Sequence, residues 1–207
     1  QGTLGQRLKH YLRYFIDSRV MLSWLVVLGS IKIADGLSGP IIKPLLVDLG
    51  LSFSQIGIYI TMLGALAALC GAGLASFVLS KISRAKALIL FSILKMISLL
   101  GFTGLAFLHD QGQPIQPWLI YVINALEDMF AAMLLVVILT LVMQYSRKDY
   151  AATDFTFQVS LMATVSGMLY TVSGFAGDYL GYFNYLLLIS LVAILALVPI
   201  YKWMKLS

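Results

Sequence analysis

The sequence is poor in charge. Lys and Arg account for 14 of its 207 residues and Asp and Glu for 9, so charged side chains make up 11% of the chain. Soluble domains carry charge at roughly a quarter of their positions. Because 60% of the residues are hydrophobic, the composition excludes an ordinary soluble domain and indicates an integral membrane protein.

Residues that carry out chemistry are also scarce. Cys70 is the single cysteine, which excludes an internal disulfide. The two histidines, His10 and His109, lie outside the apolar segments or at their edge, and no Ser–His pair or metal-ligand pattern forms around them. No nucleotide-binding loop is present, so direct ATP coupling would need another chain. We therefore expect no enzymatic activity, no metal and no cofactor.

The N-terminal residues lack a secretory signal, because no basic region followed by a cleavage site opens the chain. Since residue 1 is Gln, we expect a piece of a longer protein or a processed product. We assign residues 1–18 to an amphipathic helix on the cytoplasmic membrane surface, with a solvated linker as the alternative. This assignment rests on one helical stripe of apolar side chains: Leu4, Leu8, Leu12 and Phe15.

Six apolar segments follow and predict a transmembrane bundle over residues 19–207. A spanning helix needs about 20 mostly apolar residues, and each segment has that length. The joins between them are short, and none has the composition of a linker to a second domain. The expected spans are residues 20–47, 54–80, 87–108, 117–144, 153–177 and 181–204.

Basic residues occur at alternate joins. They precede the first span, lie between spans two and three and between spans four and five, and end the chain, whereas the other three joins have none. Cytoplasmic loops carry the excess of Lys and Arg, so both termini are expected in the cytoplasm. This placement explains every basic residue except Lys32, Lys43 and Lys95, and it removes the need for a nucleic-acid partner.

The first span carries Lys32 and Asp35 near its middle. A charge in hydrocarbon is costly, so such residues indicate a functional site by default. At a spacing of three residues, the two side chains share a helix face and can form an ion pair. Pro40 and Pro44 follow, and they predict that the outer end of this span is not a regular helix.

The fourth span carries Asn124, Glu127 and Asp128, which we expect to crowd one face near mid-membrane. Two adjacent carboxylates in a low-dielectric site resist being ionised together. This property suits a proton carrier or part of a substrate path. The alternative is an acid that only neutralises Lys32 or Lys95.

Four further polar residues within spans are candidates for supporting roles. A lysine in span three can reach the membrane surface or pair with an acid, and hydroxyl and amide side chains in span five can bond to neighbouring helices or to a ligand. They are Lys95, Thr156, Gln158 and Ser160.

The six spans divide into two three-helix units of opposite orientation, and the charged helix comes first in each. Trp24 precedes Asp35 by 11 residues, and Trp118 precedes Asp128 by 10. Inverted repeats with a site at their interface are typical of secondary transporters. The expected fold is therefore an all-α membrane protein built as two inverted three-helix repeats.

The loop after the second span resembles a motif of the major facilitator superfamily, Gly-x-x-x-Asp-Arg-x-Gly-Arg-Arg. Here the stretch runs from Ser76 to Lys86, and Ser76 and Ser80 replace the glycine and the aspartate. Its basic residues are Lys81, Arg84 and Lys86. The six-helix unit itself resembles half of a transporter of this superfamily.

The chain is most similar to the C-terminal half of the muropeptide permease (AmpG-like) branch, which includes siderophore permeases. The similar stretches are residues 32–35, 48–57, 83–90, 151–158 and 174–177. The resemblance implies that the six spans are helices seven to twelve of a twelve-helix transporter. It also implies that the first helix of each unit lines the central cavity, which places Lys32, Asp35, Glu127 and Asp128 on the transport path.

The expected function is a proton-coupled secondary transporter of the bacterial inner membrane. Lys32 and Lys95 can attract a polar, anionic, medium-sized solute, and the resemblance favours a siderophore over a muropeptide. The expected partners are membrane lipid, protons, the small-molecule substrate and the N-terminal half of the same transporter. The alternatives are a muropeptide permease and a non-transporting membrane assembly partner.

The basic joins make a prediction about topology. Single cysteines introduced at Ser83 and Gln113 should react with a membrane-impermeant thiol reagent from opposite sides of the membrane. Labelling of both positions from the same side would contradict the six-span topology.

Overall fold

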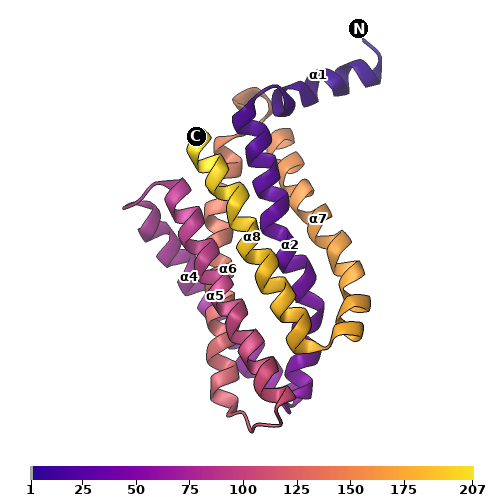
Figure 1. The fold of residues 1–207 in the computed structure, drawn as a ribbon. Helices are drawn as coiled ribbons and strands as arrows, with labels where there is room; N and C mark the ends of the chain where they lie inside the picture. The colour runs from indigo at the N-terminus through magenta and orange to yellow at the C-terminus, as the bar shows by residue number, and fades with distance from the viewer. Residues whose placement is uncertain (1) are drawn as a thin grey trace.

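Long helices account for almost all of residues 2–207, the part of the chain described by this computed structural model (Figure 1). Helix α1 projects sideways from one end of a bundle formed by the others, and no strand occurs within the described range. The elements are α1 (Leu4–Ile16), α2 (Arg19–Asp48), α3 (Phe53–Gln55), η1 (Ile56–Met62), α4 (Leu63–Leu79), α5 (Arg84–Asp110), α6 (Pro117–Gln144), η2 (Lys148–Tyr150), α7 (Ala151–Leu180) and α8 (Tyr182–Leu206).

Six helical stretches within residues 2–207 are long and apolar enough to cross a membrane, which confirms the expected number of spans. Elements α3, η1 and α4 follow one another without a break and form the second of these spans. The other five are α2, α5, α6, α7 with the short turn η2, and α8.

Polar residues at the joins set where the helices begin. The hydroxyl groups of Ser18, Ser52 and Ser83 each accept a hydrogen bond from the backbone N–H three residues later, which satisfies a donor that the first helical turn leaves free. The join between α7 and α8 is a single residue, Gly181, whose φ of 77° favours glycine.

The spans pack in a defined set of pairs. Helix α2 packs against α7 and α8, helix α6 packs against α4 and α5, and α5 also packs against α8. Two separate apolar clusters result. One surrounds Trp24, Phe91 and Trp203, and the other surrounds Phe102 and Tyr185. The residues between these clusters along α2, α5 and α6 include the intramembrane charges.

Both termini and the two basic joins, residues 80–83 and 145–147, lie at the same end of the bundle (Figure 1). The joins at residues 49–52, 111–116 and 181 lie at the opposite end. The alternation of basic residues along the sequence therefore corresponds to one basic end of the molecule. The assignment of this end to the cytoplasm stays a prediction.

Helix α1 is attached to the bundle through its C-terminal half. Phe15 is buried against the rest of the protein, and Tyr11 and Tyr14 are partly buried. Leu4 and Leu8 belong to the same apolar stripe but are 85% and 56% exposed. The stripe therefore extends past the protein, which leaves its N-terminal part available to lipid.

The prediction that Pro40 and Pro44 disrupt the first span is wrong, because α2 is helical from Arg19 to Asp48. A proline leaves the carbonyl group four residues earlier without its usual donor, and neighbouring helices can compensate in a membrane protein. Here those carbonyl groups belong to Gly36 and Pro40, and the Tyr185 hydroxyl on α8 donates at 2.7 Å to the neighbouring carbonyl oxygen of Leu37.

Helices α4 and α6 approach closely, and this contact makes a prediction about stability. A Cβ added at Gly71 would lie 2.4 Å from the carbonyl oxygen of Met129, whereas one added at Gly73 would meet nothing within 4 Å. Gly71→Ala should therefore lower the free energy of unfolding by about 1–3 kcal/mol. Gly73→Ala is the matched control, because it adds the same methyl group to the same helix. Thermal unfolding in detergent measures both, and an equal effect would contradict this account of the contact.

Candidate functional site, an ionic layer at mid-bundle

Four charged side chains from three spans form a continuous ionic layer, which we define as Lys32 and Asp35 on α2, Lys95 on α5 and Glu127 on α6. The Lys95 ammonium group donates to Oδ1 of Asp35, and its Nζ lies 3.5 Å from Oε1 of Glu127. The Nζ of Lys32 lies 3.3 Å from Oδ2 of Asp35. Lys95 therefore connects carboxylates that belong to different helices.

The ionic layer lies between the two apolar clusters. Its side chains are only 17–24% exposed. Ile31 and Phe91 belong to the cluster on one side, and Ile41 and Leu99 belong to the cluster on the other. Charges in such a position are costly unless they are paired. The packing of α2, α5 and α6 around these side chains therefore requires the ion pairs.

The sequence identified the residues of the ionic layer, but it did not identify Lys95 as the residue that connects them. The expected pairing of Lys32 with Asp35 is present. Lys95 was expected only to support the site, yet it contacts two of the three acids that the sequence had singled out. Its partners come from other helices, and spacing within one helix cannot reveal contacts of that kind.

Two of the three polar residues of α6, Asn124 and Asp128, share one face as expected, and Glu127 reaches a different helix. Glu127 contacts Lys95 on α5, whereas Asn124 and Asp128 face α4. Successive helical residues point about 100° apart, so neighbouring carboxylates reach different partners. The Asn124 side-chain amide donates to Oδ2 of Asp128 at 3.1 Å.

A local irregularity in the second span adjoins this pair. Element η1 is a π-helical turn, and the Asn124 amide also donates to the carbonyl oxygen of Ile60 within it, at 3.3 Å. A Cβ at Gly64 would lie 2.0 Å from Oδ2 of Asp128, so only glycine permits this approach. π-Helical turns occur frequently at functional sites, and no proline marks this one in the sequence.

A small cavity adjoins the ionic layer and has a volume of about 50 Å³. The polar part of its lining consists of Asp35, Lys95, Glu127, Ser38 and Ser92, and apolar residues of α2, α5, α6 and α8 make up the rest. The Ser92 hydroxyl is buried and has no hydrogen-bond partner within residues 2–207. This space is large enough for water, so the carboxylates at its wall face a cavity rather than closely packed hydrocarbon.

The candidates on α7 lie apart from the ionic layer. Thr156 and Ser160 are exposed on the outer side of the helix. Gln158 is fully buried near the basic end, where it accepts from the Trp24 indole at 2.8 Å and donates to the carbonyl oxygen of Val142 at 3.2 Å. These contacts give Gln158 a structural role in joining α2, α6 and α7.

The basic residues of the loop after the second span also make local contacts. Arg84 donates from Nη1 to the side-chain oxygen of Gln144 at 2.7 Å, which links this loop to the end of α6. The Nζ of Lys81 lies 5.7 Å from the centre of the Phe77 ring, and Lys86 is exposed. These residues therefore surround the basic end of the bundle, away from the ionic layer.

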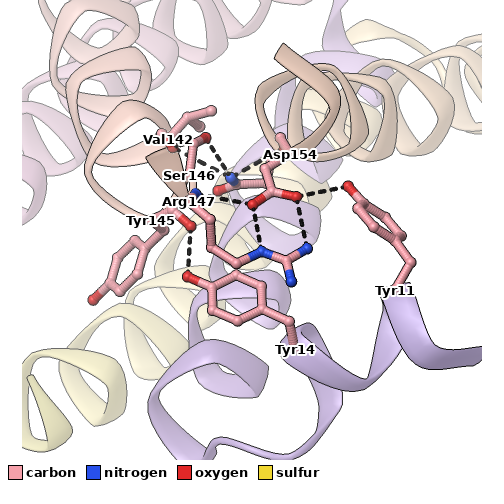
Figure 2. A network of polar contacts seen from close by, with 8 residues as sticks. Tyr11, Tyr14, Val142, Tyr145, Ser146, Arg147 and Asp154 are labelled. Atoms are coloured by element: carbon pink, nitrogen blue, oxygen red, sulfur yellow. Dashed lines mark hydrogen bonds and ion pairs between the residues drawn. The ribbon is translucent and has the colours of Figure 1, made fainter. Parts of the chain in front are cut away.

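A second polar cluster at the basic end was not identified from the sequence (Figure 2). Arg147 donates through Nε and Nη2 to the two carboxylate oxygens of Asp154, at 2.9 and 3.1 Å, and its backbone N–H donates to Oδ2 at 2.9 Å. The Tyr11 hydroxyl donates to Oδ1 at 2.8 Å. We call Tyr11, Tyr14, Tyr145, Arg147 and Asp154 the Arg147 network.

The Arg147 network holds α1 against the bundle. Tyr14 donates to the carbonyl oxygen of Tyr145 at 2.8 Å, and the Arg147 guanidinium carbon lies 4.2 Å from the centre of the Tyr14 ring. Burial and the nearby Asp154 carboxylate raise the pKa of Tyr11 to about 12, so its hydroxyl remains a donor at neutral pH. The sequence signal for this network was an aspartate one helical turn inside a span, just after a basic join.

No protein-family model matches the chain. Within residues 2–207, no group of three or more His, Cys, Asp or Glu side chains is arranged to hold a metal ion. The candidate site is therefore defined by its geometry alone.

The ionic layer makes a prediction about coupled stability. Lys95→Met and Asp35→Asn should each lower the melting temperature, because each leaves a buried charge without its partner. The double variant should lose less than the sum of the two effects, with a coupling of about 0.5–3 kcal/mol. Lys43→Met is the control, since Lys43 is exposed on α2 and should have little effect. Additive effects of the two substitutions would show that Lys95 and Asp35 do not stabilise each other.

Proposed function

We propose that this chain is the C-terminal six-helix half of a proton-coupled secondary transporter of the major facilitator superfamily, located in the bacterial inner membrane. The observation that carries the proposal is the bridging of Asp35 and Glu127 by Lys95 at mid-bundle. A membrane scaffold or an assembly partner does not need to bear the cost of such charges. The joining of three spans through ionisable groups is suited to coupling proton binding to helix movement.

The pairing of the helices supports an inverted repeat. The first unit consists of α2, α3–η1–α4 and α5, and the second consists of α6, α7 and α8. If the two units are exchanged, the pair α2–α7 becomes α6–α4 and the pair α2–α8 becomes α6–α5, while α5–α8 becomes itself. All of these pairs are in contact, so the packing pattern is unchanged by the exchange. Such symmetry is typical of transporters with a site between repeats.

The charge balance of the site supports proton coupling. Asp35, Glu127 and Asp128 provide three carboxyl groups, whereas Lys32 and Lys95 provide two ammonium groups. With all five ionised, the four charges of the ionic layer balance, and Asp128 beside it adds one excess negative charge in a low-dielectric region, which one bound proton neutralises. Glu127 and Asp128 contact different helices, so the bound proton can favour different packing depending on which carboxyl group holds it.

The exposed side of α7 supports the proposal that a second six-helix half completes the transporter. This helix is the least buried of the spans, and its exposed stripe carries hydroxyl groups along much of its length. Hydroxyl groups gain little from contact with lipid, whereas an aqueous cavity shared with six further helices would solvate them. The exposed hydroxyl residues are Thr153, Thr156, Ser160, Thr164 and Thr171.

The proposed substrate is an anionic siderophore or its iron complex, with a muropeptide as the alternative. Lys32 and Lys95 supply positive charge for either ligand, and the preference rests on sequence resemblance.

The proton role predicts a specific defect. Asp128→Asn and Glu127→Gln should abolish uphill, proton-driven uptake by the complete transporter and leave downhill exchange largely intact. Uptake and exchange are measured in vesicles with an imposed proton gradient, with membrane abundance as the control. Uphill transport equal to that of the parent in both variants would refute the proton role, and failure of both to accumulate would favour a purely structural role.

The substrate is tested in cells that lack their own importers. Radiolabelled iron–siderophore and anhydro-muropeptide are offered separately to cells that express the complete transporter. Uptake of the siderophore that falls with Lys32→Ala supports the proposal. Muropeptide uptake without siderophore uptake would reverse the preference, and uptake unchanged by Lys32→Ala would leave Lys32 only as the partner of Asp35.

A further inference from the structure

An open cleft lies between α1 and the turn η2 at the basic end of the bundle. Its volume is about 420 Å³. It is lined by Gly2, Gln6, Arg7, His10, Tyr11, Arg147 and Tyr150, and we call it the α1 cleft. Among these residues are two guanidinium groups, an imidazole, two phenols and an amide. No carboxylate lines the cleft within the described residues, so its chemistry favours an anion.

The Arg147 side chain lines this cleft and has N–H donors that Asp154 does not use. A guanidinium group has five N–H donors, and the hydrogen bonds to Asp154 use one on Nε and one on Nη2. The Asp154 carboxylate that it neutralises is fully buried. The Arg147 guanidinium carbon also lies 4.5 Å from the centre of the Tyr150 ring, which helps to fix its orientation. The remaining N–H groups are therefore held in place beside the cleft.

The other donor groups come from α1. Arg7 and His10 are exposed and line the same cleft, and neither forms an ion pair within residues 2–207. Arg13 differs, because its Nε lies 3.3 Å from Oδ2 of Asp17. The α1 cleft thus combines an oriented guanidinium group with a second, adaptable one, an arrangement suited to phosphate oxygens.

The surroundings of the cleft match the headgroup region of a membrane. Tyr150 lines the cleft at the start of a span and is half exposed, as tyrosine often is at a membrane–water interface. On α1 itself, the exposed residues Leu4 and Leu8 lie within one helical turn of the cleft residues Arg7 and Tyr11. A ligand with a phosphate group and an acyl chain would meet both the charges and the apolar stripe.

We propose that the α1 cleft binds the phosphate-bearing headgroup of an anionic membrane lipid through Arg7, His10 and Arg147. The lipid satisfies donors of Arg147 that the protein leaves free, and its acyl chains cover Leu4 and Leu8. Because Arg147 also holds Tyr11 and Asp154, the bound lipid secures α1 to the join between α6 and α7. The proposal is independent of transport, since it involves no residue of the ionic layer.

The test is a titration of the purified full chain in neutral detergent, with bound lipid counted by native mass spectrometry. Phosphatidylglycerol is the anionic probe and phosphatidylcholine is the zwitterionic comparison. One phosphatidylglycerol should bind per chain at least about tenfold more tightly than phosphatidylcholine, as expected for charge-assisted hydrogen bonds. Arg7→Gln should weaken phosphatidylglycerol binding by about tenfold.

The matched control is Lys9→Gln, which removes the same charge from the same exposed helix but lies outside the cleft. It should weaken binding by less than about twofold, because a screened surface charge contributes little. Equal weakening by the two substitutions would overturn the proposal in favour of diffuse charge attraction. Equal affinity for the two lipids would also overturn it. If soluble glycerol phosphate displaces the lipid at comparable concentrations, the site recognises free phosphate and the lipid assignment is wrong.

Discussion

The ion pairs of Lys95 hold the helices together at the middle of the bundle. Its ammonium group joins an aspartate on α2 to a glutamate on α6, and the two apolar clusters lie on either side of that contact. Without a shared cation, α2 and α6 would bring two carboxylates into the interior of the bundle, at a cost that apolar packing alone does not offset. The bundle therefore depends on an ionic contact at a depth where most membrane proteins have none.

Sequence patterns predicted the helical architecture well because the signals were local. Apolar length predicted six spans, and serines at the joins mark where several helices begin. The same kind of reasoning failed at Pro40 and Pro44, since the hydroxyl of Tyr185 that contacts the nearby backbone comes from a helix about 140 residues later. The π-helical turn η1 left no local signal, because its partner Asn124 lies on another span.

The site was only partly predictable for the same reason. The cost of intramembrane charge identified Lys32, Asp35, Glu127 and Asp128, but it could not assign partners across helices. For Gln158 the sequence left two roles open, bonding to neighbouring helices or to a ligand, and its hydrogen bonds in the structure are of the first kind. Arg147 was assigned to the topology signal alone, although the structure makes it the link between α1 and α7.

The two ends of α7 have a mechanical consequence. Near one end, the buried side chains Asp154 and Gln158 are held by several hydrogen bonds to neighbouring elements. Near the other, Gly177 packs so closely on Ile41 that an added Cβ would lie 2.2 Å from its Cδ1, and the single residue Gly181 ties the helix to α8. Contacts at both ends oppose rotation of α7 about its own axis, so its hydroxyl-bearing side is held in one direction relative to the bundle.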